Sequence, residues 1–204
     1  MKEEVKTTLN PAEVKAKPVS KTRFVVFVGL CIAIMAVSAW VVIPFGPIPF
    51  TLQIFAVAFA ILVLPPKQCM AAVGGYLLLG AIGVPVFSGM RGGIGVLAGP
   101  TGGYLWGYLI GAAVALLFLW AAKKLLEDTS KKSHVKGILI DIIAALLYVA
   151  VAYVCGWAQY MVVSGVSAEA AFLATVAPFV VVDIVKVVAA AFCARGVRLA
   201  VPER

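Results

Sequence analysis

Residues 178–191 read PFVVVDIVKVVAAA, an apolar run that holds a carboxylate, Asp183, and an ammonium group, Lys186. In a continuous helix over residues 171–195, Asp183 lies about 12 residues, or roughly 18 Å, from the start, near the middle of a membrane. A charge that faces lipid there costs about 2.5 to 3.5 kcal/mol, so both side chains are expected to point into a bundle. Their spacing of three residues places them on one helix face. The stretch therefore predicts a polar site inside a helical membrane protein.

Two interpretations of this pair are open. Asp183 and Lys186 can neutralise each other as a structural ion pair, although a buried pair rarely stabilises a protein more than apolar residues of similar size do. Charged groups within membrane spans more often mark a ligand site or an ion path. Pro178 removes a backbone hydrogen bond and is expected to bend the helix, which leaves a cavity beside Asp183.

The composition indicates that most of this chain is dissolved in lipid. Of its 204 residues 63% are apolar and 13% are charged, and the mean hydropathy is +1.08. We predict an all-α integral membrane protein with six transmembrane helices. The second helix is short, so it either begins below the membrane surface inside protein or spans the membrane with help from its neighbours. The apolar stretches cover residues 24–43, 49–64, 69–87, 103–122, 137–163 and 171–195.

Basic residues predict the orientation of the chain. Fifteen of the 17 Lys and Arg residues lie before the first predicted helix, in alternate connections and after the last helix. By the positive-inside rule both termini are cytoplasmic. Residues 1–22 are expected to form a mobile cytoplasmic tail, and residues 23–204 a single six-helix substrate-binding domain. This bias explains the net charge of +8, so no nucleic-acid partner is needed to account for it, and no nucleic-acid-binding motif is visible. The two remaining cations are Arg91 and Lys186.

A second polar feature is GMRGGIGVLAGPTGGYLWGY, residues 89–108, on the outer side between the third and fourth helices. Its density of glycine predicts an ordered loop whose backbone comes close to other groups. No GK[ST] motif or acidic strand accompanies it, which argues against a phosphate-binding loop. Arg91 in this loop is a candidate ligand contact, with lipid headgroups as its alternative partner. Trp106 and Tyr108 line the site or anchor the helix at the membrane interface.

A third feature is IPFTLQ, residues 48–53, where Thr51 can cap the short second helix and Gln53 needs hydrogen-bond partners. Together these groups outline an outward-facing pocket for an amphipathic small molecule with a carboxylate. No catalytic set and no metal or cofactor motif accompanies them, so we predict that the chain is not an enzyme. The alternative function is a stand-alone proton-coupled secondary carrier of a small carboxylate vitamin, acting through Asp183, although no inverted repeat is visible.

Four segments resemble those of a known family. The segments 48–53 (IPFTLQ), 76–87 (YLLLGAIGVPVF), 92–108 (GGIGVLAGPTGGYLWGY) and 183–186 (DIVK) are similar to those of the BioY family, the biotin-binding S components of energy-coupling-factor (ECF) vitamin transporters. The resemblance implies a multi-pass subunit of the bacterial cell (inner) membrane that captures biotin from outside with high affinity. It also implies two kinds of partner: a transmembrane coupling subunit and a pair of ATPase subunits.

The resemblance further implies roles for individual residues. Asp183 would accept hydrogen bonds from the ureido N–H groups of biotin, and Lys186 would donate to the ureido carbonyl. Arg91 would bind the valerate carboxylate, and the inverted assignment, with Lys186 on the carboxylate, stays open. Weaker contacts to the ring or tail are expected from Gln53, Thr101, Gly103 and Tyr104. The face of the first helix expected to dock the coupling subunit consists of Gly29, Ala33 and Val37.

Overall fold

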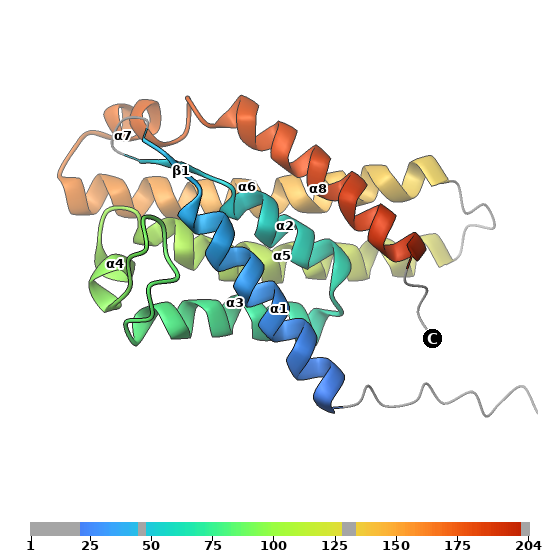
Figure 1. Ribbon diagram of the computed structural model, residues 1–204. Helices are drawn as coiled ribbons and strands as arrows, with labels where there is room; N and C mark the ends of the chain where they lie inside the picture. The colour runs from blue at the N-terminus through green and yellow to red at the C-terminus, as the bar shows by residue number, and fades with distance from the viewer. Residues whose placement is uncertain (1–20, 45–47, 128–133, 201–204) are drawn as a thin grey trace, which may run out of the picture.

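The computed structural model describes residues 21–44, 48–127 and 134–200, which form a helical bundle (Figure 1). The predicted N-terminal tail lies outside these residues, except for Lys21 and Thr22, which open the first helix. The helices are α1 (Lys21–Trp40), α2 (Gln53–Val63), α3 (Pro66–Ala81), α4 (Ile94–Ala98), α5 (Gly102–Glu127), α6 (His134–Ser164), α7 (Ala168–Thr175) and α8 (Val180–Ala200). Two short strands, β1 (Val42–Ile43) and β2 (Phe50–Thr51), pair in antiparallel fashion.

The helical membrane character of the chain is confirmed. Helices α1, α5 and α6 are long and apolar enough to cross a membrane, and α7 with α8, bent by 49°, can form a fourth span. Helix α2 has 11 residues and α3 has 16, so α2 covers only about 16 Å at 1.5 Å per residue. Six crossings and the side on which the termini lie therefore stay predictions.

Several predicted helices differ from those observed, and the ends of the first two form the strands β1 and β2 instead. The third ends at Ala81 rather than at residue 87, because Gly83 adopts a φ of 105° that stops a right-handed helix. The last apolar stretch is two helices instead of one, with a break at residues 176–179 that contains Pro178. Asp183 consequently lies in the first turn of α8 and not in the middle of a long helix.

Helix α2 can be shorter than a membrane span because protein surrounds it. It packs against α1, α5, α6 and α8, and eight of its eleven residues are buried. The strand before it is paired with β1, and the Leu52 N–H donates to the Ser38 carbonyl at 3.0 Å. Backbone hydrogen bonds are thus supplied by protein, as a membrane interior requires. At the other end of α2, Pro66 occupies the first turn of α3, where its missing N–H costs no hydrogen bond.

The two longest helices, α5 and α6, form the wall behind the pocket. Gly103, Gly107 and Gly111 recur every fourth residue on α5, and each faces the backbone of α6. A Cβ atom at Gly107 would lie 2.6 Å from the Ala152 Cα, and one at Gly111 would lie 2.7 Å from the Tyr148 carbonyl oxygen. Small residues at this spacing let membrane helices approach closely.

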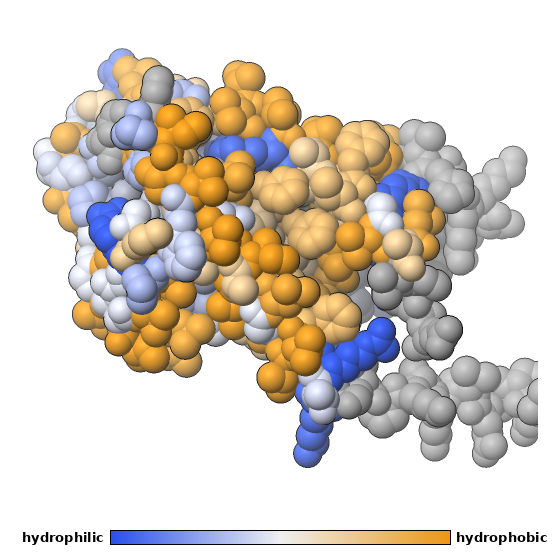
Figure 2. Space-filling model, viewed as in Figure 1, coloured by the Kyte–Doolittle hydropathy of each residue, from blue (hydrophilic) through white to orange (hydrophobic). Residues whose placement is uncertain are grey.

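The two ends of the bundle differ in composition. The start of α1, the α2–α3 turn, the end of α5, the start of α6 and the end of α8 lie at one end, and the hairpin, α4 and α7 lie at the other (Figure 1). Apolar surface covers the middle of the molecule, and most hydrophilic residues lie toward its ends (Figure 2). The described basic residues near the first end are Lys21, Arg23, Lys67, Lys123, Lys124, Lys136, Arg195 and Arg198.

Candidate ligand-binding site

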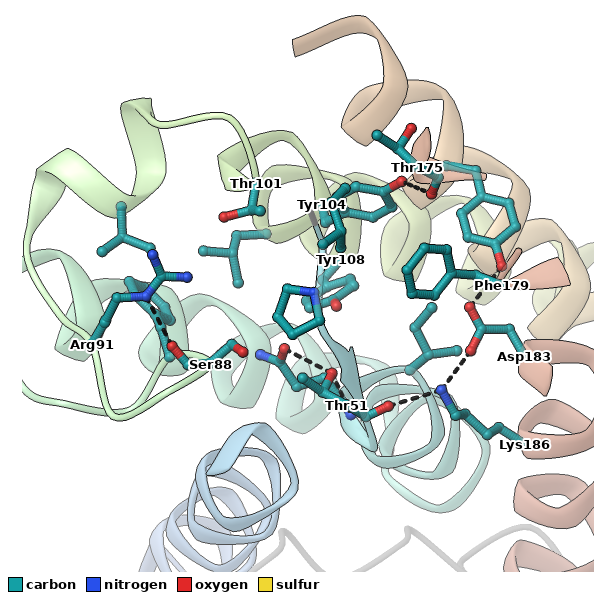
Figure 3. Close-up of a pocket in the computed structure, with 18 residues that line it drawn as sticks. Thr51, Ser88, Arg91, Thr101, Tyr104, Tyr108, Thr175, Phe179, Asp183 and Lys186 are labelled. Atoms are coloured by element: carbon teal, nitrogen blue, oxygen red, sulfur yellow. Dashed lines mark hydrogen bonds and ion pairs between the residues drawn. The ribbon is translucent and has the colours of Figure 1, made fainter. Parts of the chain in front are cut away.

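A cavity lies where the hairpin, the glycine-rich loop and the α7–α8 break meet (Figure 3). The empty space in and in front of it, open solvent included, is about 640 Å³. Aromatic and aliphatic side chains form most of its wall, and Asp183 and Lys186 lie on one side of it while Arg91 lies on another.

Asp183 is held by groups from two helices. The carboxylate is 2% exposed, and its Oδ1 accepts a hydrogen bond from Lys186 Nζ at 2.7 Å. Its Oδ2 accepts from the Tyr153 hydroxyl of α6 at 2.6 Å. Because Asp183 lies in the first turn of α8, the positive end of the helix dipole also favours a negative charge there. The break at Pro178 creates this helix start and confirms the predicted bend.

Lys186 joins α8 to the hairpin. Its Nζ donates to the Thr51 carbonyl oxygen at 2.8 Å and lies 5.5 Å from the centre of the Phe50 ring. The Phe50 ring in turn lies 4.4 Å from the Phe179 ring in the α7–α8 break. An ammonium above an aromatic face gains a cation–π interaction. The hairpin, the break and the ion pair therefore form one connected wall of the cavity.

Gln53 lines the cavity but also ties three segments together. Its Oε1 accepts from the Thr51 hydroxyl at 3.1 Å, and its Nε2 donates to the Tyr76 hydroxyl at 2.7 Å. The Tyr76 hydroxyl donates to the Val86 carbonyl at 2.9 Å, in the loop after α3. A side-chain amide has two N–H groups, so one remains for a ligand. Leu52 occupies the N-cap position of α2 without a side-chain cap, and the Thr51 hydroxyl accepts from the Gln53 N–H at 3.4 Å, in keeping with the predicted capping role of Thr51.

The remaining predicted site residues separate into two groups. Thr101 and Tyr104 line the cavity, and the Tyr104 hydroxyl donates to the Thr175 carbonyl. Gly103 faces away from it, toward Cys155 of α6, where it allows the two helices to pack. The two neighbouring aromatic residues, Tyr108 and Trp106, also differ in position. Tyr108 lines the cavity and is 4% exposed, whereas Trp106 is 44% exposed on the outside, as an interfacial anchor would be.

Arg91 stands at the edge of the cavity, opposite the ion pair. Its Nε donates to the Ser88 carbonyl at 3.1 Å, and its guanidinium group is directed toward Thr101 (Figure 3). The two terminal nitrogens of a guanidinium group in this position can bind both oxygens of a carboxylate. Among residues 21–44, 48–127 and 134–200, no cluster of three His, Cys, Asp or Glu side chains could hold a metal ion.

The sequence predictions missed two residues that shape the site, Tyr153 and Gln159. Tyr153 is 30 residues from Asp183, and no spacing rule connects the two. Gln159 of α6 donates through Nε2 to the Leu97 and Gly99 carbonyls, both at 2.8 Å, and thereby fixes the segment before Thr101. Its signal was the same as that of Gln53, an amide within an apolar run.

The predicted docking face of α1 lies on the outside of the bundle. Gly29 and Ala33 are exposed, and Val37 is 54% exposed. A Cβ atom at Gly29 would meet no other group within 4 Å among the residues that the structure describes. The three positions are four residues apart, so they share one face of the helix.

Comparisons with known proteins agree with this architecture. The model of the BioY family matches residues 7–203. The chain is 35% identical over 174 residues to the probable biotin transporter BioY of Pyrococcus horikoshii, covering 85% of this chain and 95% of that protein. It is 51% identical over 96 residues to the biotin transporter BioY of Thermotoga maritima, a match that spans 47% of this chain and only 56% of the relative.

A solved structure shares the fold. It is the crystal structure of the S-component for biotin from an ECF-type ABC transporter, with a TM-score of 0.75 and 25% sequence identity. The similarity covers 87% of this chain and 92% of that one. Since the family model spans nearly the whole sequence and the bundle has the same shape, this chain belongs to the BioY family.

Proposed function

We propose that this chain is the substrate-specific subunit of an ATP-driven vitamin transporter and captures biotin from the outer face of a bacterial cell (inner) membrane with high affinity. The observation that carries the proposal is the placement of Asp183 and Lys186 on one side of a cavity with Arg91 on the other. Relatives named as biotin transporters and the solved biotin S-component support it.

The ion pair provides groups that match a ureido ring. Such a ring has two N–H donors and one carbonyl acceptor. Asp183 would accept from an N–H group, and Lys186 would donate to the ring carbonyl. The ring carbonyl would then replace the Thr51 carbonyl as a partner of Lys186 or be added to it. Hydrogen bonds to charged groups contribute about 1.5 to 3 kcal/mol each. A ligand would thus use a charged pair whose positions are already fixed.

The rest of the ligand would meet an apolar wall and a cation. Ile54, Leu105 and Phe179 can surround the fused ring system and the aliphatic tail. Arg91 would bind the tail carboxylate, with Gln53, Thr101 and Tyr104 as further contacts. Gly103 would act through the packing of α5 on α6, which positions Thr101 and Tyr104.

The partners would be a transmembrane coupling subunit and two ATPase subunits. The exposed face of Gly29, Ala33 and Val37 on α1 offers small side chains on which a partner helix can pack closely. The basic end of the bundle would face the cytoplasm with both termini, as the positive-inside rule predicts. The subunit itself would bind and deliver its substrate without chemical change.

Calorimetry on the purified full-length chain in detergent tests the proposal. Biotin should bind tightly, desthiobiotin more weakly, and a vitamin without a ureido ring not at all. Binding of all three with similar affinity, or of none, would refute biotin capture. Biotin uptake by vesicles that contain this chain alone tests the alternative, a proton-coupled carrier that needs no ATPase partners. Biotin uptake that an uncoupler abolishes would favour that alternative.

A further inference from the structure

The Ser88 hydroxyl is a buried polar group that none of the networks above uses. Its Oγ has less than 1 Å² of exposed surface and no hydrogen-bond partner in the part of the chain that the structure describes. Ser88 also lines the cavity. Buried hydroxyl groups in native proteins almost always have a partner, because desolvation without a hydrogen bond is unfavourable. A ligand in the cavity is positioned to supply the partner.

The turn that carries Ser88 is conformationally costly. Gly89 has a φ of 69° and Met90 a φ of 56°, a region that a residue with a side chain rarely adopts. The Met90 side chain is 64% exposed, so its own packing does not explain the strain. The turn is closed by a hydrogen bond from the Phe87 N–H to the Arg91 carbonyl at 2.9 Å. Its effect is to bring Ser88 and Arg91 to the same edge of the cavity.

The surroundings of Ser88 favour an anion. The Ser88 carbonyl accepts from Arg91 Nε at 3.1 Å, so the same residue that presents the hydroxyl also orients the guanidinium group. Ser88, Arg91 and Thr101 lie on one side of the cavity, away from Asp183 and Lys186 (Figure 3). Among the described residues that line the cavity, Asp183 is the only acidic one. The charge on the Ser88 side is therefore positive and unbalanced.

We infer that the Ser88 hydroxyl is a specificity-determining hydrogen-bond donor of a carboxylate subsite that it forms with Arg91. The inference rests on the proposed function, because it assigns the group that recognises the ionised tail of the ligand. The hydroxyl donates to one carboxylate oxygen, and the terminal nitrogens of Arg91 donate to the same group. A hydrogen bond to a charged acceptor is roughly twice as strong as one between neutral groups, so the subsite selects an ionised carboxylate over an ester.

The test compares two ligands on two proteins. Biotin and biotin methyl ester are titrated by calorimetry into the full-length parent chain and the Ser88→Ala variant. We expect the variant to bind biotin about ten- to a hundredfold more weakly and the ester within about threefold of the parent. Ser164→Ala is the matched control, since Ser164 is exposed at the end of α6 and does not line the cavity. Retained binding of the ester shows that the variant has folded.

Each other outcome overturns an identifiable part of the inference. Unchanged biotin affinity in Ser88→Ala would show that the hydroxyl contacts no ligand group. An equal loss for biotin and its ester, including a complete loss of both, would show that Ser88 acts on the whole pocket and not on the carboxylate. If the parent itself bound neither ligand, the proposed function would fail, whereas the first two outcomes leave biotin capture intact.

Discussion

The two sides of the cavity hold their charges in different ways. Asp183 is 2% exposed, and both of its carboxylate oxygens have donors that come from α6 and α8. Arg91 is exposed, and its Nε donates to the carbonyl of a nearby turn residue, Ser88. A fixed, buried pair favours affinity because little conformational freedom is lost on binding, whereas an exposed cation mainly attracts its ligand and adapts to it. The comparison indicates that the ureido ring would be selected by fixed groups and the tail by adaptable ones.

The largest expected effect is at Asp183. Asp183→Asn should weaken biotin binding by about a hundredfold or more, because the amide loses the charge that pairs with Lys186 and leaves a buried cation without its partner. Calorimetry measures the affinity, and thermal unfolding in detergent measures stability. The control is Glu169→Gln, which removes an exposed carboxylate on α7. Parent-like affinity in Asp183→Asn would mean that the buried side does not bind the ligand.

Arg91 should give an intermediate effect that depends on salt and on the ligand carboxylate. Arg91→Ala should weaken biotin binding by about tenfold, whereas biotin methyl ester should bind almost as it does to the parent. Because Arg91 is exposed, the association rate of biotin with the parent should fall as ionic strength rises, and this dependence should weaken in the variant. Stopped-flow fluorescence at several salt concentrations measures it. An equal loss for both ligands would contradict a carboxylate contact at Arg91.

The smallest effect is expected at Tyr153. Tyr153→Phe keeps the ring that packs against Tyr104 and removes the donor to Asp183 Oδ2, so affinity for biotin should fall by roughly three- to tenfold. Tyr160→Phe, a change of the same kind elsewhere on α6, serves as the control. A loss as large as that of Asp183→Asn would show that the hydroxyl binds the ligand itself and does not merely position the carboxylate.

Sequence patterns predicted the helical segments and the inward direction of the charges, but they placed Asp183 wrongly along its helix. Periodicity identifies apolar stretches, and two helices joined at a break of four residues look like one stretch. Pro178 indicated the bend, yet not that the break would start a new helix at Val180. The glycine-rich segment was predicted as an ordered loop, but it contains the short helix α4 and, from Gly102, the start of α5, and the packing role of Gly103 was not foreseen.

The sequence by itself determined that this chain is a helical membrane protein with an acid and a base directed inward, because the cost of placing charge in lipid leaves few alternatives. Only the tertiary structure decided which groups meet that pair. Tyr153 and Thr51 lie 30 and 135 residues from the side chains they bind. Rules of sequence spacing relate residues within about one helical turn. Partners as distant as Tyr153 and Thr51 are determined by how the helices pack, which depends on the surfaces of all of them together.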